Sequence, residues 1–268
     1  MTEALLIRQE GGVLILSNNN VAARNALSPE FYAAVTAALT KAAQDPSVGA
    51  IILTGEGGHF CAGGDLRQLA KRRELPMQER REKLEGLHNL IRAVRDCPKP
   101  VIAAVEGAAA GAGLSLALAC DMLVAAKNSV FSVAYVKVGL TPDGGATAFL
   151  AEFVSRQVLT ELCLTGERIS GERLHALGAV NRLAEPGEAV AQAMQLAQQV
   201  AQGPELAMSR IKELCRQAPY NDLEQQLELE AQYMVRSQES EESREGIGAF
   251  FEKRSPNFRP GAQVPAAE

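Results

Sequence analysis

The stretch KPVIAAVEGAAAGAGLSLALACDMLVAAKNSVFSVAYVKVGLTPDGGATAFL, residues 99–150, decides the fold of this chain. An apolar run (101–105) breaks at Glu106-Gly107 and continues through small residues (108–113) into an apolar run (114–126) that we predict to be helical. Small residues let the backbone approach a ligand closely, and a helix N-terminus presents unpaired N–H groups at the positive end of its dipole. The stretch therefore predicts a site for a negative, or developing negative, oxygen. The alternative is a Gly/Ala-rich helix packed tightly in a core.

Composition and charge limit the class of protein. The chain has 268 residues, of which 47% are hydrophobic and 22% charged, and its net charge is −5. Nucleic-acid binding requires a basic face, and crossing a bilayer requires about 20 consecutive apolar residues; the sequence offers neither, nor a signal-peptide layout. Five cysteines without CxxC spacing and three dispersed histidines indicate neither a disulfide framework nor a metal site. We expect a cytoplasmic protein that binds no nucleic acid, membrane or structural metal.

The order of predicted elements indicates an α/β core followed by helices. Strand and helix patterns alternate up to about residue 200, and the near-continuous apolar run 48–54 is typical of a parallel strand buried on both faces. Gly11-Gly12 predicts a hairpin between two short strands, and Ser28 before Pro29 predicts the cap of the first helix. We predict a core at 1–200, a helical oligomerisation region at 201–258 and a flexible tail at 259–268. The helical region is expected to complete the surface of another subunit.

A second glycine-rich segment, GEGGHFCAGGDLRQL at 55–69, also runs into a predicted helix. Asp65 is placed to cap that helix. The chain therefore builds two N–H donor sites from two separate segments.

At this point the motifs resemble a known family, the crotonase (enoyl-CoA hydratase/isomerase) superfamily. The resemblance is carried, in order, by Asn25-Ala26-Leu27, HFCAGGDL (59–66), residues 99–126, FSVAYVKVGLTPDGG (131–145) and REGIGAFFEKRSPNF (244–258). It implies a spiral of ββα units, a C-terminal helical region that builds a homotrimer or a dimer of trimers, and acyl-CoA thioester substrates. It implies no metal and no cofactor beyond the coenzyme A of the substrate.

The resemblance also implies the site residues. The family's oxyanion hole falls on the backbone N–H groups of Gly64 and Ala112, which agrees with the two donor segments derived above. Its contacts with CoA and substrate fall on Arg24, Ala62, Asp65, Leu66, Tyr135 and Lys253. Lys253 could equally be a solvated surface charge.

The position of the carboxylates separates members of the family. The two glutamates of the hydratases fall here on Ser115 and Tyr135. A serine without a base partner and a tyrosine with a pKa near 10 are poor general bases. Asp143, in GLTPDGG, matches an aspartate of the isomerases, in which it moves a proton between carbons of an enolate. Its alternative role is to cap the following helix.

The sequence thus predicts an acyl-CoA isomerase with Asp143 as proton shuttle, most similar to the epoxyphenylacetyl-CoA isomerases of phenylacetate degradation. Two rivals stay open at this point: an enoyl-CoA hydratase that uses Asp143 and an ordered water, and a non-catalytic acyl-CoA-binding subunit. Glu106 and Asp121, the other carboxyl groups of the central stretch, are interpreted as structural.

Overall fold

Two β-sheets form the framework of the computed structural model, which describes residues 3–259. In the larger sheet the strand order is β1 (Leu5–Glu10), β2 (Val13–Asn18), β3 (Ala50–Gly55), β4 (Val101–Val105), β6 (Met122–Ala126), β9 (Arg182–Ala184). The smaller sheet contains β5 (Ala108–Ala110), β7 (Val130–Ser132) and β8 (Arg168–Ser170). The N-terminal hairpin β1–β2 is antiparallel, as Gly11-Gly12 predicts, whereas β2 to β9 of the larger sheet run parallel.

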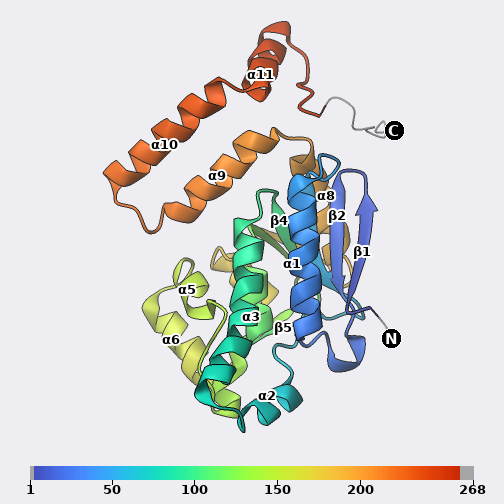
Figure 1. Cartoon of the computed structure of the whole chain (residues 1–268), viewed down its shortest axis with the longest axis vertical. Helices are drawn as coiled ribbons and strands as arrows, with labels where there is room; N and C mark the ends of the chain where they lie inside the picture. The colour runs from blue at the N-terminus through green and yellow to red at the C-terminus, as the bar shows by residue number, and fades with distance from the viewer. Residues whose placement is uncertain (1–2, 260–268) are drawn as a thin grey trace.

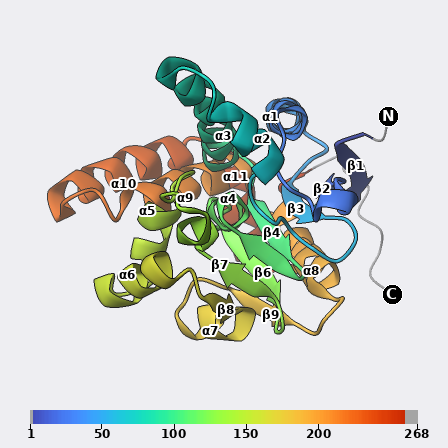
Figure 2. The same cartoon turned by 90° about the horizontal axis from the view of Figure 1, so that it is seen from below.

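Helices cover both faces of the larger sheet. On β3, Ile52 joins the core beneath α8 (Ala189–Ala201), whereas Ile51 and Leu53 join the core that also contains α1 (Pro29–Gln44) and α3 (Met77–Asp96). Successive side chains of a strand point to opposite faces. The apolar run 48–54 is therefore apolar because both of its faces are buried, which confirms the predicted α/β core (Figure 2).

Several predicted helix starts are confirmed by their caps. The Ser28 side chain accepts a hydrogen bond from the Phe31 N–H at the start of α1, and Asp65 accepts from the Arg67 and Gln68 N–H groups at the start of α2 (Leu66–Arg72). The remaining helices before residue 189 are η1 (Val21–Ala23), α4 (Ala112–Leu118), η2 (Ala134–Val138), α5 (Ala146–Ala151), α6 (Arg156–Thr165) and α7 (Gly171–Ala176).

The predicted helix over 114–126 is wrong. Helix α4 ends at Leu118, and Met122–Ala126 is strand β6, which pairs in parallel with β4 and β9. The change from helix to strand falls at Asp121. Its carboxylate accepts a hydrogen bond from the Val101 N–H at 2.7 Å and so attaches the start of β6 to β4. A continuous apolar run is typical of a buried strand as much as of a buried helix, and the hydrogen-bonding edge of β4 decides between them.

The C-terminal part contains helices α9 (Glu205–Gln217), α10 (Leu223–Gln238) and α11 (Glu241–Glu252). α9 and α10 extend to one side of the sheets, and α11 lies at the end of the molecule opposite α2 (Figure 1). The helical character of this part is as predicted, and the division near residue 200 stays a prediction. Of the predicted tail, Arg259 is described and pairs with Glu205 at 3.0 Å; 260–268 lie outside the described residues.

Two lysines connect α9 to the core. Lys99, whose side chain is 1% exposed, pairs with Glu205 at 2.6 Å. The Lys212 ammonium pairs with Asp121 at 2.6 Å and donates to the Cys97 and Lys99 carbonyls at 2.6 and 2.8 Å. Within residues 3–259, no helix has the length and apolar character to span a bilayer.

We predict that Lys212→Met lowers the free energy of unfolding by about 2 kcal/mol, between the values for exposed and for buried ion pairs, because the Asp121 carboxylate, whose side chain is 24% exposed, loses its charge partner. Urea denaturation at fixed protein concentration measures the change. The control is Lys41→Met at an exposed position of α1, where a change within about 0.5 kcal/mol is expected. Equal losses in the two variants would contradict the prediction.

Candidate active site

The glycine-rich segment 59–64 is hydrogen-bonded to the chain on both of its sides. On one side lies the segment 24–27: the Ala62 N–H donates to the Arg24 carbonyl at 3.0 Å, and the Leu27 N–H donates to the Gly63 carbonyl at 2.8 Å. On the other side lies the segment 106–110, with the pairs Phe60 N–H to Glu106 O (2.9 Å), Cys61 N–H to Ala108 O (2.9 Å) and Ala110 N–H to Cys61 O (3.0 Å). Three motifs that are distant in the sequence therefore form one backbone layer.

Two glycines make the close contact within this layer possible. A Cβ atom on Gly113 would lie 2.5 Å from the Cys61 carbonyl oxygen, and one on Gly63 would lie 2.7 Å from the Ala110 carbonyl oxygen. Contacts below 3.0 Å force something to shift, and here the obstacle is backbone. Gly63 also has φ +100°, a conformation that favours glycine. The small residues of both motifs are therefore required by backbone packing.

The layer leaves two N–H groups at the starts of two helices. Gly64 precedes α2, and Ala112 is the first residue of α4. Among residues 3–259, neither N–H donates a hydrogen bond to another group of the chain. The two segments lie together, since a Cβ on Gly63 would be 3.7 Å from the Ala112 nitrogen. Both donors that the sequence predicts are thus available to an oxygen atom.

Asn25 holds the glycine-rich segment in place, a role that the sequence reasoning missed. Its buried side-chain amide donates to the carbonyls of Glu56 at 2.8 Å and His59 at 2.6 Å. Its backbone has φ +59°, a conformation that asparagine tolerates better than most residues. The signal in the sequence is Asn25 itself, which lies in a quoted motif directly before the predicted helix cap.

Asp143 forms a hydrogen-bonded cluster with Ser115 and Tyr135, the two positions on which the resemblance places the hydratase glutamates. The Tyr135 hydroxyl donates to the Asp143 carboxylate at 2.7 Å. The Ser115 hydroxyl donates to the Asp143 backbone carbonyl at 2.9 Å, and the two hydroxyl oxygens lie 3.4 Å apart. Asp143 does not cap α5, whose N-cap is Gly145 and has no side-chain cap bond. The alternative role of Asp143 as a helix cap is therefore wrong.

Burial raises the pKa of the Asp143 carboxyl above its usual 3.8. The hydrogen bond from Tyr135 opposes this, as do the nearby charges of His88 and Arg72, each of which lowers the pKa. Burial and the adjacent Asp143 carboxylate raise the pKa of Tyr135 above 10, so that its hydroxyl keeps its proton. Tyr135 is therefore a hydrogen-bond donor to Asp143 and not a base.

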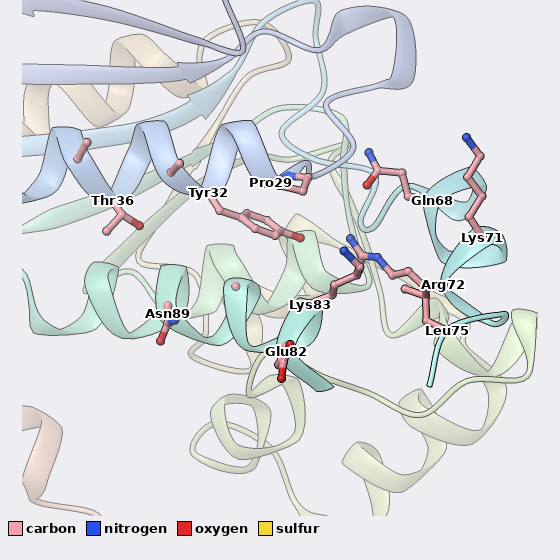
Figure 3. A pocket seen from close by; sticks show the side chains of 13 residues that line it. Pro29, Tyr32, Thr36, Gln68, Lys71, Arg72, Leu75, Glu82, Lys83 and Asn89 are labelled. Atoms are coloured by element: carbon pink, nitrogen blue, oxygen red, sulfur yellow. The ribbon is translucent and has the colours of Figure 1, made fainter. Parts of the chain in front are cut away.

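A groove of about 970 Å³ lies between α1, α2 and α3 (Figure 3). Residues next to its lining contact both parts of the site, the Gly64 donor and the Asp143 turn. Leu69, next to the lining residue Gln68, is 3.4 Å from the position of a Cβ on Gly64, and Leu87, next to the lining residue Gly86, is 3.4 Å from that of a Cβ on Gly144. The groove therefore lies beside the Gly64 donor on one side and beside the Asp143 turn on the other.

The other predicted contact residues fall into two places. Arg24, Ala62, Asp65 and Leu66 surround the Gly64 donor, with Arg24, Ala62 and Leu66 exposed. Lys253 lies at the end of α11, so within a single chain it is at the end of the molecule opposite α2 (Figure 1). The roles of these residues in binding CoA stay predictions.

The remaining carboxyl groups of the central stretch have structural contacts. Glu106 accepts a hydrogen bond from the Ala189 N–H at 2.8 Å, at the start of α8, and Asp121 pairs with Lys212. Both contacts agree with the structural interpretation. Within residues 3–259, no three His, Cys, Asp or Glu side chains gather in a way that could hold a metal ion.

The fold and the site together define a class: a spiral α/β core that presents two backbone N–H donors and a half-buried carboxyl. The sequence profile of the enoyl-CoA hydratase/isomerase family matches residues 8–261. The chain belongs to this family, as its motifs predict.

Its relatives include both activities of the family. The 1,2-epoxyphenylacetyl-CoA isomerase of Escherichia coli (strain K12) is 36% identical over 259 residues, 96% of this chain and 99% of the relative. The 2,3-dehydroadipyl-CoA hydratase of the same organism is 33% identical over 260 residues, 97% and 99% of the two chains. A crystal structure of an enoyl-CoA hydratase from Polaromonas sp. JS666 superposes with a TM-score of 0.92 at 47% identity, covering 94% of this chain and 98% of that chain. The crotonase-like fold is thereby confirmed.

We predict that Gly113→Ala destabilises the protein by at least about 1 kcal/mol, because the added Cβ presses on the Cys61 backbone. The matched control is Gly86→Ala in α3, where the nearest contact of the added Cβ is an ordinary 3.5 Å to the Tyr32 ring. This helical replacement is expected to stabilise the protein by about 0.5 kcal/mol. Thermal and urea unfolding of the two variants measure the difference, and a Gly113→Ala variant as stable as wild type would refute the packing argument.

Proposed function

We propose that the protein is an acyl-CoA isomerase, in which Asp143 moves a proton between two carbons of the acyl group. The observation that carries the proposal is the cluster around Asp143. A carboxylate that is partly buried, raised in pKa and held by a tyrosine hydroxyl is suited to take up and return a proton. Ser115 and Tyr135, on which the resemblance places the two hydratase glutamates, are not bases.

In the proposed reaction, the thioester carbonyl oxygen accepts hydrogen bonds from the Gly64 and Ala112 N–H groups. The Asp143 carboxylate removes a proton from a carbon of the acyl chain, and the electron pair of the broken C–H bond moves to the carbonyl oxygen to give an enolate. Two preorganised donors stabilise this oxyanion, and the loss of a single such donor costs about 2.7–4 kcal/mol in known cases. The protonated Asp143 then returns its proton to another carbon, and the double bond ends in a new position.

We propose further that no metal or redox cofactor takes part, and that the coenzyme A of the substrate is bound along Arg24, Ala62, Asp65 and Leu66. Of these residues next to the Gly64 donor, Arg24, Ala62 and Leu66 are exposed and Asp65 is half-buried. Lys253 would reach such a CoA group from the C-terminal helices of a neighbouring copy. An assembly of the homotrimer or dimer-of-trimers type is supported by the exposed apolar side chains of these helices: Leu223, Leu227, Met234, Val235, Ile247, Phe250 and Phe251.

The second candidate is an enoyl-CoA hydratase, which the names of several relatives favour. In that reaction Asp143 would be the only acid–base residue. It would act with an ordered water to add water across the double bond. Incubation with crotonyl-CoA separates the two functions, since hydration removes the absorbance of the enoyl group. The third possibility, a non-catalytic acyl-CoA-binding subunit, predicts tight binding of CoA esters without exchange of their protons in D₂O.

We predict that Asp143→Asn lowers the rate of isomerisation about 100-fold or more, the usual contribution of a general acid–base group. The asparagine amide preserves the size of the side chain, so the dissociation constant of the CoA ester is expected to change little. A panel of straight-chain enoyl-, dienoyl- and epoxyphenylacetyl-CoA esters measures the rate, and titration calorimetry measures binding. Unchanged turnover in this variant would end the proposal for Asp143.

We predict that Tyr135→Phe moves the acid limb of the kcat/KM profile to higher pH. Asp143 must be deprotonated to act as the base, so activity falls as the pH drops through its pKa in the free enzyme. The Tyr135 hydrogen bond lowers this pKa, together with the charges of His88 and Arg72, while burial raises it. Removal of the hydroxyl therefore leaves the pKa higher, and activity is lost at a higher pH.

Ser115→Ala is the matched control for Tyr135→Phe, because the Ser115 hydroxyl donates to the Asp143 backbone carbonyl and not to its carboxylate. The acid limb of the kcat/KM profile of Ser115→Ala is expected to shift less from that of wild type than the limb of Tyr135→Phe does. A limb that moves to lower pH in Tyr135→Phe would contradict the assignment of Asp143 as the base.

A further inference from the structure

The groove between α1, α2 and α3 has an apolar floor and a positively charged rim. Side chains from α1 and the α2–α3 turn, including Tyr32, Ala33, Ala37 and Leu75, supply carbon surface. Three lining residues are cations, Lys71, Arg72 and Lys83, against one carboxylate, Glu82. The groove therefore has a local excess of positive charge in a chain whose net charge is −5.

Arg72 is the cation that lies deepest along this rim. Its side chain is half-buried, whereas Lys71 and Lys83 are exposed. Figure 3 shows the Tyr32 ring directed toward the Arg72 and Lys83 head groups. The Arg72 charge lowers the pKa of both Tyr32 and Asp143, against the effect of burial, which raises both.

The Arg72 guanidinium has no carboxylate partner within the described part of the chain. None of the salt bridges among residues 3–259 includes Arg72, nor does any side-chain hydrogen bond. The Glu82 carboxylate of the same groove accepts instead from Gln78 at 3.0 Å. A half-buried arginine is partly desolvated, so a carboxylate from a ligand finds five N–H donors that are not already committed to the chain.

The groove adjoins the predicted reaction site. Helix α2, which lines the groove, contacts Gly64 through Leu69, and helix α3 contacts the Asp143 turn through Leu87. An acyl chain whose thioester lies at Gly64 and Ala112 would meet the groove where it leaves the site. Its methylene groups would cover apolar surface, and its far end would meet the charged rim.

We infer that the groove binds the acyl part of the thioester, and that Arg72 makes the site selective for acyl chains that end in a carboxylate. This inference rests on the proposed binding of an acyl-CoA ester at Gly64 and Ala112. The apolar floor suits the middle of such a chain, and the guanidinium suits a carboxylate because it can donate two parallel hydrogen bonds to it. Arg72 is thus a specificity-determining residue and takes no part in the proton transfer.

The experiment compares pairs of saturated CoA esters that differ at the far end of the chain: adipoyl-CoA with hexanoyl-CoA, and suberoyl-CoA with octanoyl-CoA. Titration calorimetry with the full-length protein gives the dissociation constants. Wild type is expected to bind the carboxylate member of at least one pair about tenfold more tightly, as for one charge-assisted hydrogen-bonded pair. Arg72→Met is expected to abolish this preference, and Arg72→Lys is expected to restore part of it.

The matched control is Arg73→Met, which removes an exposed arginine that follows Arg72 but does not line the groove. This variant is expected to keep the preference, and circular dichroism checks that each variant is folded. Equal binding of the two members of both pairs by wild type would overturn the inference. So would an equal loss of affinity for every ester and for free CoA in Arg72→Met, because Arg72 would then bind the phosphates of CoA.

The binding test is independent of turnover, since saturated esters carry no double bond to move. A wild-type preference for the carboxylate esters that Arg72→Met abolishes would support the inference even if Asp143→Asn retained full activity. Conversely, loss of isomerisation in Asp143→Asn with no preference between esters would support the proposed reaction and overturn the selectivity. The two proposals therefore fail in different experiments.

Discussion

The site depends on the backbone contact between residues 60–63 and 106–113. Carbonyl and N–H groups of the two segments pair directly, and the Gly113 position leaves no room for a Cβ, which would lie 2.5 Å from the Cys61 carbonyl oxygen. This contact brings the starts of α2 and α4 together and leaves the Gly64 and Ala112 N–H groups without partners in the described chain. The sheet, the flanking segment 24–27 and the Asn25 amide all hold the same layer.

Much of this layer could be predicted from the sequence, because its cause is local. Glycine lets two backbone segments approach closely, so GGD at 63–65 and the small residues at 108–113 indicate two donor segments, with a tightly packed Gly/Ala-rich helix as the alternative for the second. The helix caps at Ser28 and Asp65 were predictable for the same reason. The prediction for 114–126 failed because an apolar run carries no period, and only the edge of β4 makes residues 122–126 a strand.

The contacts of Asp143 could not be predicted from the residues alone. Tyr135 and Asp143 belong to η2 and to the turn before α5, and Ser115 belongs to α4, so their hydrogen bonds depend on how three short elements pack. The same holds for Arg72, which in the sequence is one more charge in a charged surface segment. Its position at the rim of a groove follows from where α2 lies relative to α1 and α3, which the local sequence does not indicate.

The bond from the Ser115 hydroxyl to the Asp143 carbonyl has a consequence for how such a site can evolve. It fixes the main chain at position 143 by a contact in which the side chain at 143 takes no part. In the proposed reaction, a replacement of the Asp143 side chain removes the proton-transfer group and keeps this main-chain contact. Scaffold and reaction are separable here, and a position of this kind allows one fold to acquire a different activity through a single codon.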